Sequence, residues 1–159
     1  MPQEARRLLR TPVGILRVTA NERGVTAIER ISRASAVPRA KVSARATRHV
    51  DMAVRQLREY FAGTRRNFTV PLHLEGTEFQ QQAWAAMRNI RYGHTMSYAQ
   101  QAKAIGKPKA MRAVGSANGA NPIPIIVPCH RVIASDGSLG GYALGVKMKR
   151  ALLALEHHA

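Results

Sequence analysis

The segment SYAQQAKAIGKPKAMRAVGSAN, residues 97–118, predicts two short helices joined by a tight turn. A capping-box pattern at Ser97 and Gln100 starts the first helix. The turn Gly106-Lys107-Pro108 ends that helix and starts the second, which is predicted over 109–118. Two short helices connected in this way are typical of a helix-turn-helix unit.

The second predicted helix has a packing face and a basic face. Lys109, Arg112 and Ser116 lie on the basic face, at spacings of three and four residues. A solvated surface is the ordinary explanation for such a pattern, but no acidic residue balances the charge here. The pattern therefore favours a surface that contacts DNA. The residues expected to pack on the opposite face are Ala110, Ala113, Val114 and Ala117.

The rest of the chain predicts a small sheet-and-helix region followed by a mostly helical region. A boundary is expected near 74–76, and a capping-box pattern at Thr77 and Gln80 starts the helical part. The remaining expected elements are strands over 14–19, 25–28 and 68–72, a basic loop over 37–48, a helix over 49–61 that Gly63 ends, a turn at 135–137 and a closing helix over 149–157.

The only cysteine of the chain lies in Ile125-Ile126-Val127-Pro128-Cys129-His130-Arg131-Val132. The apolar run predicts a buried strand that ends at Pro128, after which a thiol, an imidazole and a guanidinium follow in consecutive positions. The thiolate is the reactive form of cysteine, and nearby positive charge lowers its pKa. A lone cysteine is more often a small buried hydrophobic residue, so both interpretations stay open at this point.

Length and composition limit the classes of protein to consider. The chain has 159 residues and is 45% hydrophobic, enough for one ordinary domain or two small ones. A single cysteine excludes an internal disulfide and a zinc site built on several thiolates. Residues 1–10 lack the apolar segment of a signal peptide, and no apolar run is long enough to span a membrane. We therefore expect a soluble protein of a reducing cytoplasm, near the nucleoid in a bacterial host.

The charge of the chain points to a polyanionic partner. Lys and Arg number 25 and Asp and Glu number 9, which gives a formal net charge of +16. No acidic residue occurs between Phe79 and Ser135, whereas a generic solvated surface would mix the two signs. Nucleic acid is the most common partner of such a surface.

An ordered set of motifs resembles one known family. The motifs are Ser97-Tyr98, PKAMRAVG at 108–115, ANGANP at 117–122, Pro128-Cys129-His130-Arg131-Val132, Gly140-Gly141-Tyr142, and Lys149 with Leu152-Leu153-Ala154-Leu155-Glu156. Together they resemble the O6-alkylguanine-DNA alkyltransferases, also called methylated-DNA–protein-cysteine methyltransferases. The resemblance is strong over 77–156 and weak over the first seventy residues. It implies an α/β (α+β) fold, with a ribonuclease H-like α/β domain at 1–74 and a winged-helix-like domain with the helix-turn-helix at 77–159.

The resemblance also implies a role for each matching catalytic residue. Cys129 would be the nucleophile that accepts the alkyl group, and His130 would take the thiol proton through a water. Glu156 would hold and polarise His130, like the third member of a hydrolase triad. Tyr98 would cover the extruded nucleotide and supply a proton toward the leaving guanine.

Further residues would bind DNA and form the base pocket. Arg112 would enter the base stack, while Lys107, Lys109, Ser116 and Ser135 would approach the DNA. Asn121 would fix the turn before the cysteine. The residues expected at the base pocket are Tyr142, Ala143, Val132 and Leu144. Because Leu144 replaces a family glycine, we expect methyl groups to be accepted and benzyl-sized groups to react poorly.

The implied reaction is a single-turnover transfer to cysteine that uses no cofactor and no metal. The expected partner is double-stranded DNA with alkylated guanine, bound by a monomer, with cooperativity and O4-alkylthymine repair left open. One alternative is a non-enzymatic lesion-binding or helix-turn-helix DNA-binding protein, although lesion sensors of this kind lack the cysteine. A cysteine hydrolase is a further alternative, but no glycine-rich nucleophile elbow surrounds Cys129.

Overall fold

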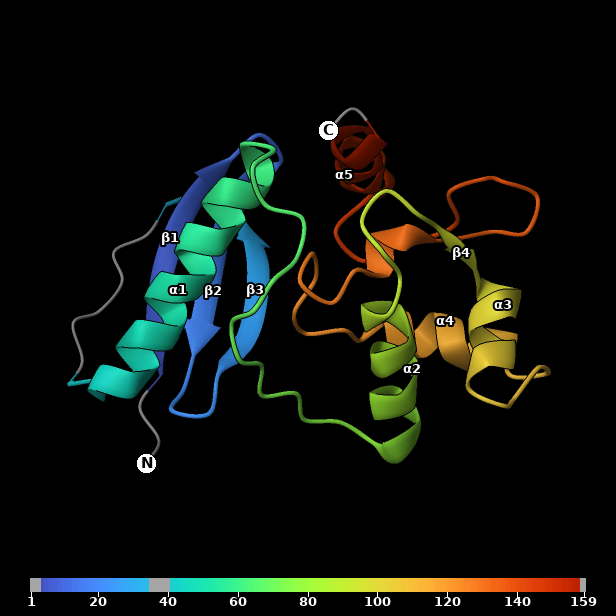
Figure 1. The fold of residues 1–159 in the computed structure, drawn as a ribbon, viewed down its shortest axis with the longest axis horizontal. Coiled ribbons are helices and arrows are strands. Elements are labelled where there is room, and N and C mark those ends of the chain that lie inside the picture. The colour runs from blue at the N-terminus through green and yellow to red at the C-terminus, as the bar shows by residue number, and fades with distance from the viewer. Residues whose placement is uncertain (1–3, 35–40, 158–159) are drawn as a thin grey trace. The chain divides into compact units, whose positions relative to one another are not determined.

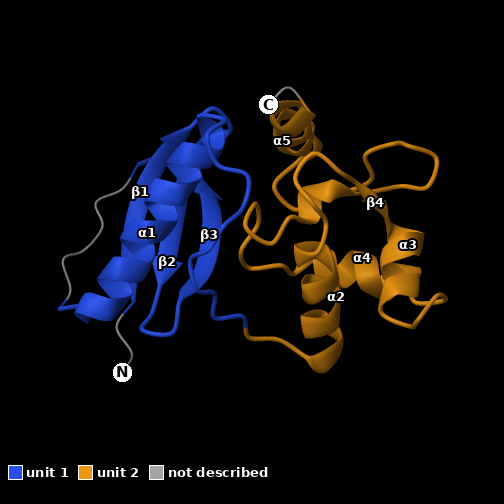
Figure 2. Ribbon diagram, viewed as in Figure 1, with its two compact units in different colours: residues 1–74 blue, residues 75–159 orange. Residues whose placement is uncertain are grey.

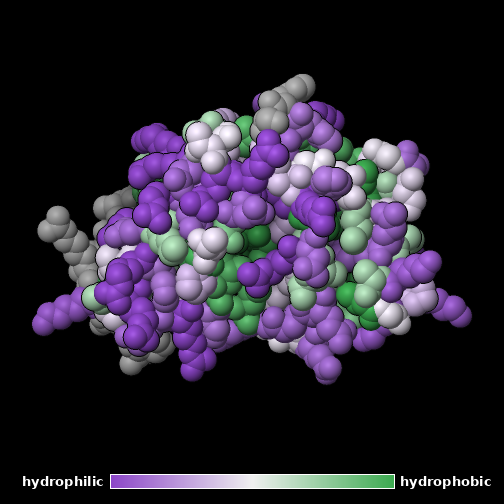
Figure 3. Space-filling view, viewed as in Figure 1, coloured by the Kyte–Doolittle hydropathy of each residue, from purple (hydrophilic) through white to green (hydrophobic). Residues whose placement is uncertain are grey.

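The computed structural model describes residues 4–34 and 41–157. The chain forms two compact units, Met1–Leu74 and Glu75–Ala159, which we call unit 1 and unit 2 (Figure 2). Part of the predicted basic loop at 37–48 lies outside the described residues. Hydrophilic residues dominate the face of the molecule drawn in Figure 3. None of the described helices is long and apolar enough to cross a membrane.

Unit 1 is a three-stranded antiparallel sheet covered by one helix (Figure 1). The strands are β1 (Ala5–Thr11), β2 (Gly14–Ala20) and β3 (Val25–Ile31), in that order across the sheet. The strands predicted over 14–19 and 25–28 correspond to β2 and β3. The sequence did not predict β1, because three arginines interrupt its alternation of apolar and polar residues.

Helix α1 (Ala44–Phe61) packs across β1 and β2, and its Val50 and Leu57 are fully buried. It begins five residues earlier than predicted, because the Ser43 side chain accepts a hydrogen bond from the Ala46 N–H and caps the helix. The helix ends as predicted, and Gly63 follows with a φ of 79°, in the left-handed region that glycine tolerates.

The strand predicted over 68–72 is wrong. Only Leu72 pairs with the sheet, through an isolated bridge to Val25. The N–H groups of Thr69 and Val70 donate instead to the Gln56 side chain of α1, at 3.0 and 3.2 Å. Pro71 has no N–H to add to a ladder. The segment is therefore held by the buried Gln56 amide and by one bridge to β3, and not by a continuous strand ladder.

Unit 2 contains four helices and a two-stranded parallel ladder among its described residues. The helices are α2 (Glu78–Arg88), α3 (Tyr98–Ala104), α4 (Met111–Gly119) and α5 (Val146–His157), and the ladder pairs β4 (Met96–Ser97) with β5 (Val132–Ile133). Both predicted capping boxes are present with both of their hydrogen bonds, at the starts of α2 and α3. Helix α5 begins three residues earlier than predicted.

Buried polar contacts join the three helices around the helix-turn-helix. The indole N–H of Trp84 on α2 donates to the Ala117 carbonyl of α4 at 2.8 Å. The side chains of Gln101 on α3 and Asn118 on α4 exchange two hydrogen bonds, at 2.8 and 2.9 Å. Gln101 also donates to the Ala83 carbonyl of α2 at 3.1 Å. These contacts fix the position of α4 against its two neighbours.

Two details of α4 differ from the prediction. The helix starts at Met111, two residues late, because Lys107 accepts a hydrogen bond from the Ala110 N–H in a preceding turn. Ala113 is exposed, whereas the sequence predicted that it packs. Asn118, which the sequence did not predict to pack, is buried instead. Its hydrogen bonds with Gln101 satisfy the side-chain amide, which would otherwise be costly to bury.

The buried strand predicted before the cysteine is also wrong. Residues 123–128 are buried, but they form turns with one isolated bridge, and Ile125 has a φ of 75°. Prolines at 122, 124 and 128 remove the N–H groups that a strand ladder needs. Asn121 supports these turns, because its amide donates to the Val127 carbonyl at 2.8 Å and accepts from the Ile123 N–H at 2.9 Å.

Candidate functional site

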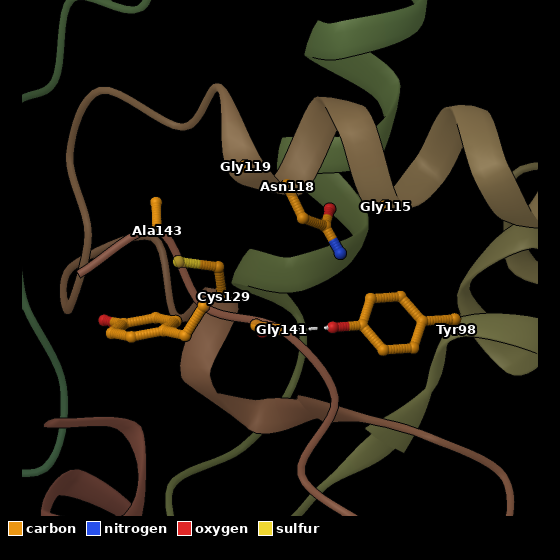
Figure 4. Close-up of a pocket in the computed structure, with 8 residues that line it drawn as sticks. Tyr98, Gly115, Asn118, Gly119, Cys129, Gly141 and Ala143 are labelled. Atoms are coloured by element: carbon orange, nitrogen blue, oxygen red, sulfur yellow. Dashed lines mark hydrogen bonds between the residues drawn. The ribbon is translucent and has the colours of Figure 1, made fainter. Parts of the chain in front are cut away.

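A pocket of about 320 Å³ opens beside the cysteine of unit 2 (Figure 4). This volume lies in the range of small-molecule sites. The Tyr98 hydroxyl and the Asn118 amide point toward the middle of the site from α3 and α4. The lining residues are Tyr98, Gly115, Asn118, Gly119, Cys129, Gly141, Tyr142 and Ala143.

Cys129 is the first residue of the 3-10 turn η1 (Cys129–Arg131) and is 8% exposed. Burial raises the pKa of its thiol. Hydrogen bonds from Asn121 and Tyr142 and the charge of Lys149 act in the opposite direction. The prediction that His130 and Arg131 supply the charge next to the thiol is wrong, because both side chains bind a carboxylate of α5 instead.

That carboxylate is Glu156, which holds both side chains in a buried cluster. His130 Nε2 lies 2.6 Å from Glu156 Oε2. The Arg131 guanidinium donates from Nε to Oε1 at 2.8 Å and from Nη2 to Oε2 at 3.0 Å, and its Nη1 donates to the Ile90 carbonyl at 2.7 Å. Burial works against the ionisation of Glu156, but the hydrogen bonds and charges of His130 and Arg131 outweigh it and lower the pKa of the carboxyl to about 2.

The same cluster sets the protonation of the imidazole. Burial lowers the pKa of His130, although its hydrogen bond to Glu156 acts the other way, so we assign a neutral ring at neutral pH. The ring then donates from Nε2 to the carboxylate, which leaves a lone pair on Nδ1. Nδ1 is buried and has no hydrogen-bond partner among the described residues. The residue that follows the cysteine therefore has a buried ring nitrogen that can accept a proton.

Tyr98 provides a proton donor on the other side of the pocket. Its hydroxyl donates to the Gly141 carbonyl at 3.4 Å. Burial raises the pKa of this phenol, and negative charge on Cys129 raises it further. The phenol therefore holds its proton more tightly than a free tyrosine does.

Lys149 of α5 is a residue of the site that the sequence did not assign. Its buried ammonium donates to the carbonyls of Val132, Leu139 and Gly141, at 2.6, 2.5 and 3.1 Å. It thus ties the segment after the cysteine to the loop that forms one wall of the pocket. Burial lowers the pKa of this lysine, and the thiolate of Cys129 raises it. A lysine three and four residues before the buried Leu152 and Leu153 was the available sequence signal.

The structure places only part of the predicted base pocket around the cavity. Tyr142 and Ala143 line it, but Val132 and Leu144 do not. Val132 is fully buried, its carbonyl accepts from Lys149, and its N–H donates to the Cys129 carbonyl. The expected narrowing of the pocket by Leu144 therefore has no support from the lining. The sequence did not predict that Asn118 and the glycines at 115, 119 and 141 line the site.

The predicted DNA-contacting residues lie on the surface of unit 2. Arg112 and Ser116 are exposed on the outer side of α4, and Lys109 is exposed in the turn before it. Lys107 in that turn is also exposed, with its ammonium 5.1 Å from the centre of the Phe79 ring. Ser135 is exposed in the turn that follows β5. No group of His, Cys, Asp and Glu side chains that could hold a metal ion occurs in the described ranges.

Two family models match the chain over almost its whole length. The model described as "6-O-methylguanine DNA methyltransferase, DNA binding domain" matches residues 78–158. The model described as "6-O-methylguanine DNA methyltransferase, ribonuclease-like domain" matches residues 5–74.

Several relatives carry the name methylated-DNA–protein-cysteine methyltransferase. The one from Methanosarcina barkeri is 41% identical over 151 residues, which are 95% of this chain and 96% of the relative. The one from Mycobacterium tuberculosis is 59% identical over 104 residues, which are 65% of this chain and 63% of the relative.

Solved structures agree with these matches. The crystal structure of Mycobacterium tuberculosis O6-methylguanine methyltransferase has a TM-score of 0.83 and 41% identity, covering 98% of this chain and 94% of that one. The structure of the Mycobacterium tuberculosis protein OGT in complex with DNA has a TM-score of 0.84 and 44% identity, covering 96% and 92%.

Proposed function

The chain belongs to the 6-O-methylguanine DNA methyltransferase family, and on that premise we propose that it repairs DNA by moving the alkyl group of O6-alkylguanine to Cys129. One observation carries the choice of acceptor. Cys129 holds the only thiol of the chain, and it lines the pocket. The next residue in the sequence is His130, which forms a buried hydrogen bond with Glu156. The N-terminal domain is 1–74, and the catalytic and DNA-binding domain is 77–159.

The transfer begins with the thiol proton. Nδ1 of His130 accepts that proton through a water, while Glu156 holds the ring by its Nε2–H and stabilises the positive charge that forms. Ionisation of the thiol is needed because the carbon on guanine O6 is saturated, and its displacement requires a strong nucleophile in line with the C–O bond. The charge of Lys149 favours the thiolate against the effect of burial.

The S–C bond then forms as the C–O bond breaks, and the electron pair of that bond leaves with the guanine. Tyr98 donates a proton to the leaving base, so that no free oxyanion is released. His130 then returns the thiol proton to solvent, and the Tyr98 phenol takes up a proton from solvent. In the net reaction the thiol loses one proton and the guanine gains one. The thioether product has no carbonyl for water to attack, so each molecule reacts once.

DNA is the partner, and a nucleotide in a duplex must leave the stack to reach a pocket of this kind. Extrusion of a nucleotide costs a few kcal/mol. The exposed Arg112 of α4 fills the gap that the base leaves and offsets part of this cost. Lys107, Lys109, Ser116 and Ser135 contact the DNA around it. The substrate is double-stranded DNA with alkylated guanine, and a monomer binds it.

Mass spectrometry of the peptide that contains Cys129 tests this function. The protein is mixed with an oligonucleotide duplex that bears O6-methylguanine. We expect a permanent gain of one methyl group on this peptide, abolished in Cys129→Ala while binding to the duplex persists. Unmodified protein that binds the lesion tightly would instead indicate a lesion-binding protein without transfer activity.

A further inference from the structure

Unit 1 carries more of the excess positive charge than unit 2, although unit 2 holds the thiol and the helix-turn-helix. Residues 1–74 contain 15 Lys and Arg against 5 Asp and Glu, a net charge of +10. Residues 75–159 contain 10 against 4, a net charge of +6, which completes the +16 of the chain. The DNA contacts proposed for unit 2 therefore leave most of the charge without a role.

The carboxylates of unit 1 do not offset the remaining arginines, because they are already paired. Four of the five form ion pairs within the described residues: Glu4 with Arg6, Asp51 with Arg7, Glu29 with Arg17, and Glu59 with Arg65. Each of these pairs uses one arginine, so the other basic residues keep their full charge. Like charges that lie close together repel each other and destabilise the compact state.

Part of this charge lies on one side of α1. Arg45, Arg48, Arg55 and Arg58 are exposed, and none of them is in an ion pair in the part of the chain that the structure describes. We call these four residues the arginine face. They lie on the side of α1 opposite its buried residues, which pack on the sheet. Two acidic residues of α1 lie on this side, and each is paired outside the arginine face: Asp51 with Arg7 at 3.2 Å and Glu59 with Arg65 at 2.9 Å.

The spacing of the arginine face fits a duplex backbone. Arg58 lies thirteen positions after Arg45, so at a rise of 1.5 Å per residue the arginine face is about 20 Å long. One DNA strand carries a charge every 3.4 Å along the axis, so about six phosphates fall within this length. Guanidinium groups bind phosphate oxygens with two parallel hydrogen bonds, which favours arginine over lysine on such a surface.

We propose that the arginine face of unit 1 binds the phosphate backbone of duplex DNA, as a second contact separate from that of α4. The choice of DNA among polyanions rests on the proposed repair function. The contact is independent of sequence and of the lesion, since phosphates carry no base information. It holds the protein on undamaged DNA while unit 2 encounters successive nucleotides.

The salt dependence of binding to a lesion-free duplex tests the proposal. The full-length chain is compared with Arg48→Gln/Arg55→Gln, two positions about two helical turns apart on one stripe of α1. Each phosphate contact contributes about 0.9 to the slope of log affinity against log salt concentration. We expect the slope to fall by about 1.8 in the double variant.

A matched control removes the same charge from arginines that are already paired. Arg6→Gln/Arg17→Gln also lowers the net charge by two, but both of these arginines bind carboxylates outside α1, at 3.4 and 3.2 Å. We expect its slope to stay close to that of the unmodified chain. Equal slopes in the two double variants, or an unchanged slope in Arg48→Gln/Arg55→Gln, would overturn the proposal.

Two further measurements separate a loss of DNA binding from a loss of folding. Urea unfolding monitored by circular dichroism checks that each variant is folded, and Arg45→Gln/Arg58→Gln tests the other half of the arginine face if the first pair does not fold. No step of the test uses alkyl transfer. If the slope responds to the arginine face while Cys129 stays unmodified in the separate experiment with the O6-methylguanine duplex, this surface is supported and the repair function is rejected.

Discussion

At the scale of single residues, Glu156 is the most connected side chain of the site. It accepts from both His130 and Arg131 and is 4% exposed. An exposed ion pair contributes little to stability, whereas removal of one partner from a buried pair leaves an unpaired buried charge. The cluster therefore supports the fold of unit 2 as well as the base beside Cys129.

Replacement of Glu156 by glutamine tests this double role. We expect Glu156→Gln to lower the free energy of unfolding by about 3–5 kcal/mol, because Arg131 loses its buried counter-charge. Urea titration gives the value. Glu29→Gln is the control, since it breaks an exposed pair with Arg17 and should cost about 0–1 kcal/mol. Similar losses in both variants would contradict the assigned role of the cluster.

The position of Lys149 near the thiol leads to a prediction about the pKa of Cys129. Loss of a nearby opposite charge raises the pKa of an acid, so Lys149→Met should raise the pKa of Cys129 further. Alkylation by iodoacetamide, followed against pH, reports this pKa. Lys147→Met, at an exposed position of the same helix, is the control and should leave the profile unchanged. A profile in Lys149→Met that matches the unmodified protein would exclude a charge effect.

At the scale of elements, Gln101 joins three helices. It hydrogen-bonds Asn118 of α4 in both directions and donates to the Ala83 carbonyl of α2. Its loss leaves the buried side-chain amide of Asn118 without its hydrogen-bond partner. We expect Gln101→Ala to lower the free energy of unfolding by about 1–3 kcal/mol in urea titration. Lys103→Ala, exposed on the same helix, should change it by less than about 0.5 kcal/mol.

Sequence predicted the elements whose signals are local. The capping boxes at Ser97 and Thr77 mark helix starts because their hydrogen bonds join residues three apart. The elements it missed depend on distant partners. Thr69 and Val70 bind Gln56, and the apolar run before Cys129 is held in turns by Asn121 rather than in a strand. No pattern in the neighbouring sequence predicts these hydrogen bonds.

The same distinction applies to the site. The order of the motifs predicted roles for Cys129, His130 and Glu156, and the structure brings His130 of η1 and Glu156 of α5 together. The spacing of Lys149 from Leu152 and Leu153 signals only a position on the buried side of the helix. Its hydrogen-bond partners could not be predicted, because they are backbone carbonyls, which every residue possesses. The exclusion of Leu144 from the pocket lining depends on the path of the loop, which a single substitution does not reveal.

At the scale of the whole molecule, the buried cluster predicts acid sensitivity. The pKa of Glu156 falls from 4.5 to about 2 in the folded state, so its contribution is complete above pH 4.5 and is lost as the pH drops toward 2. That shift corresponds to a contribution on the order of 3 kcal/mol. The lowered pKa of His130 adds a loss that begins as the pH falls through about 6.5, where the unfolded imidazole takes up a proton.

Urea unfolding at a series of pH values checks this prediction. The free energy of unfolding should decline below pH 6.5 and more steeply below pH 4.5. The decline below pH 4.5 should be smaller in Glu156→Gln, which has no carboxyl at this position to titrate. The same decline in both proteins would show that other carboxylates govern acid unfolding.

Trp84 gives the molecule a built-in optical reporter. It is the only indole of the chain, it is 2% exposed, and its N–H binds the Ala117 carbonyl of the helix that presents Arg112. Fluorescence excited at the red edge of aromatic absorption thus comes from unit 2 alone. A red shift of that emission during denaturation marks the moment when α2 and α4 separate. The loss of ellipticity reports the unfolding of unit 1 and of unit 2. If the red shift occurs at the same denaturant concentration as the loss of ellipticity, the two units unfold cooperatively.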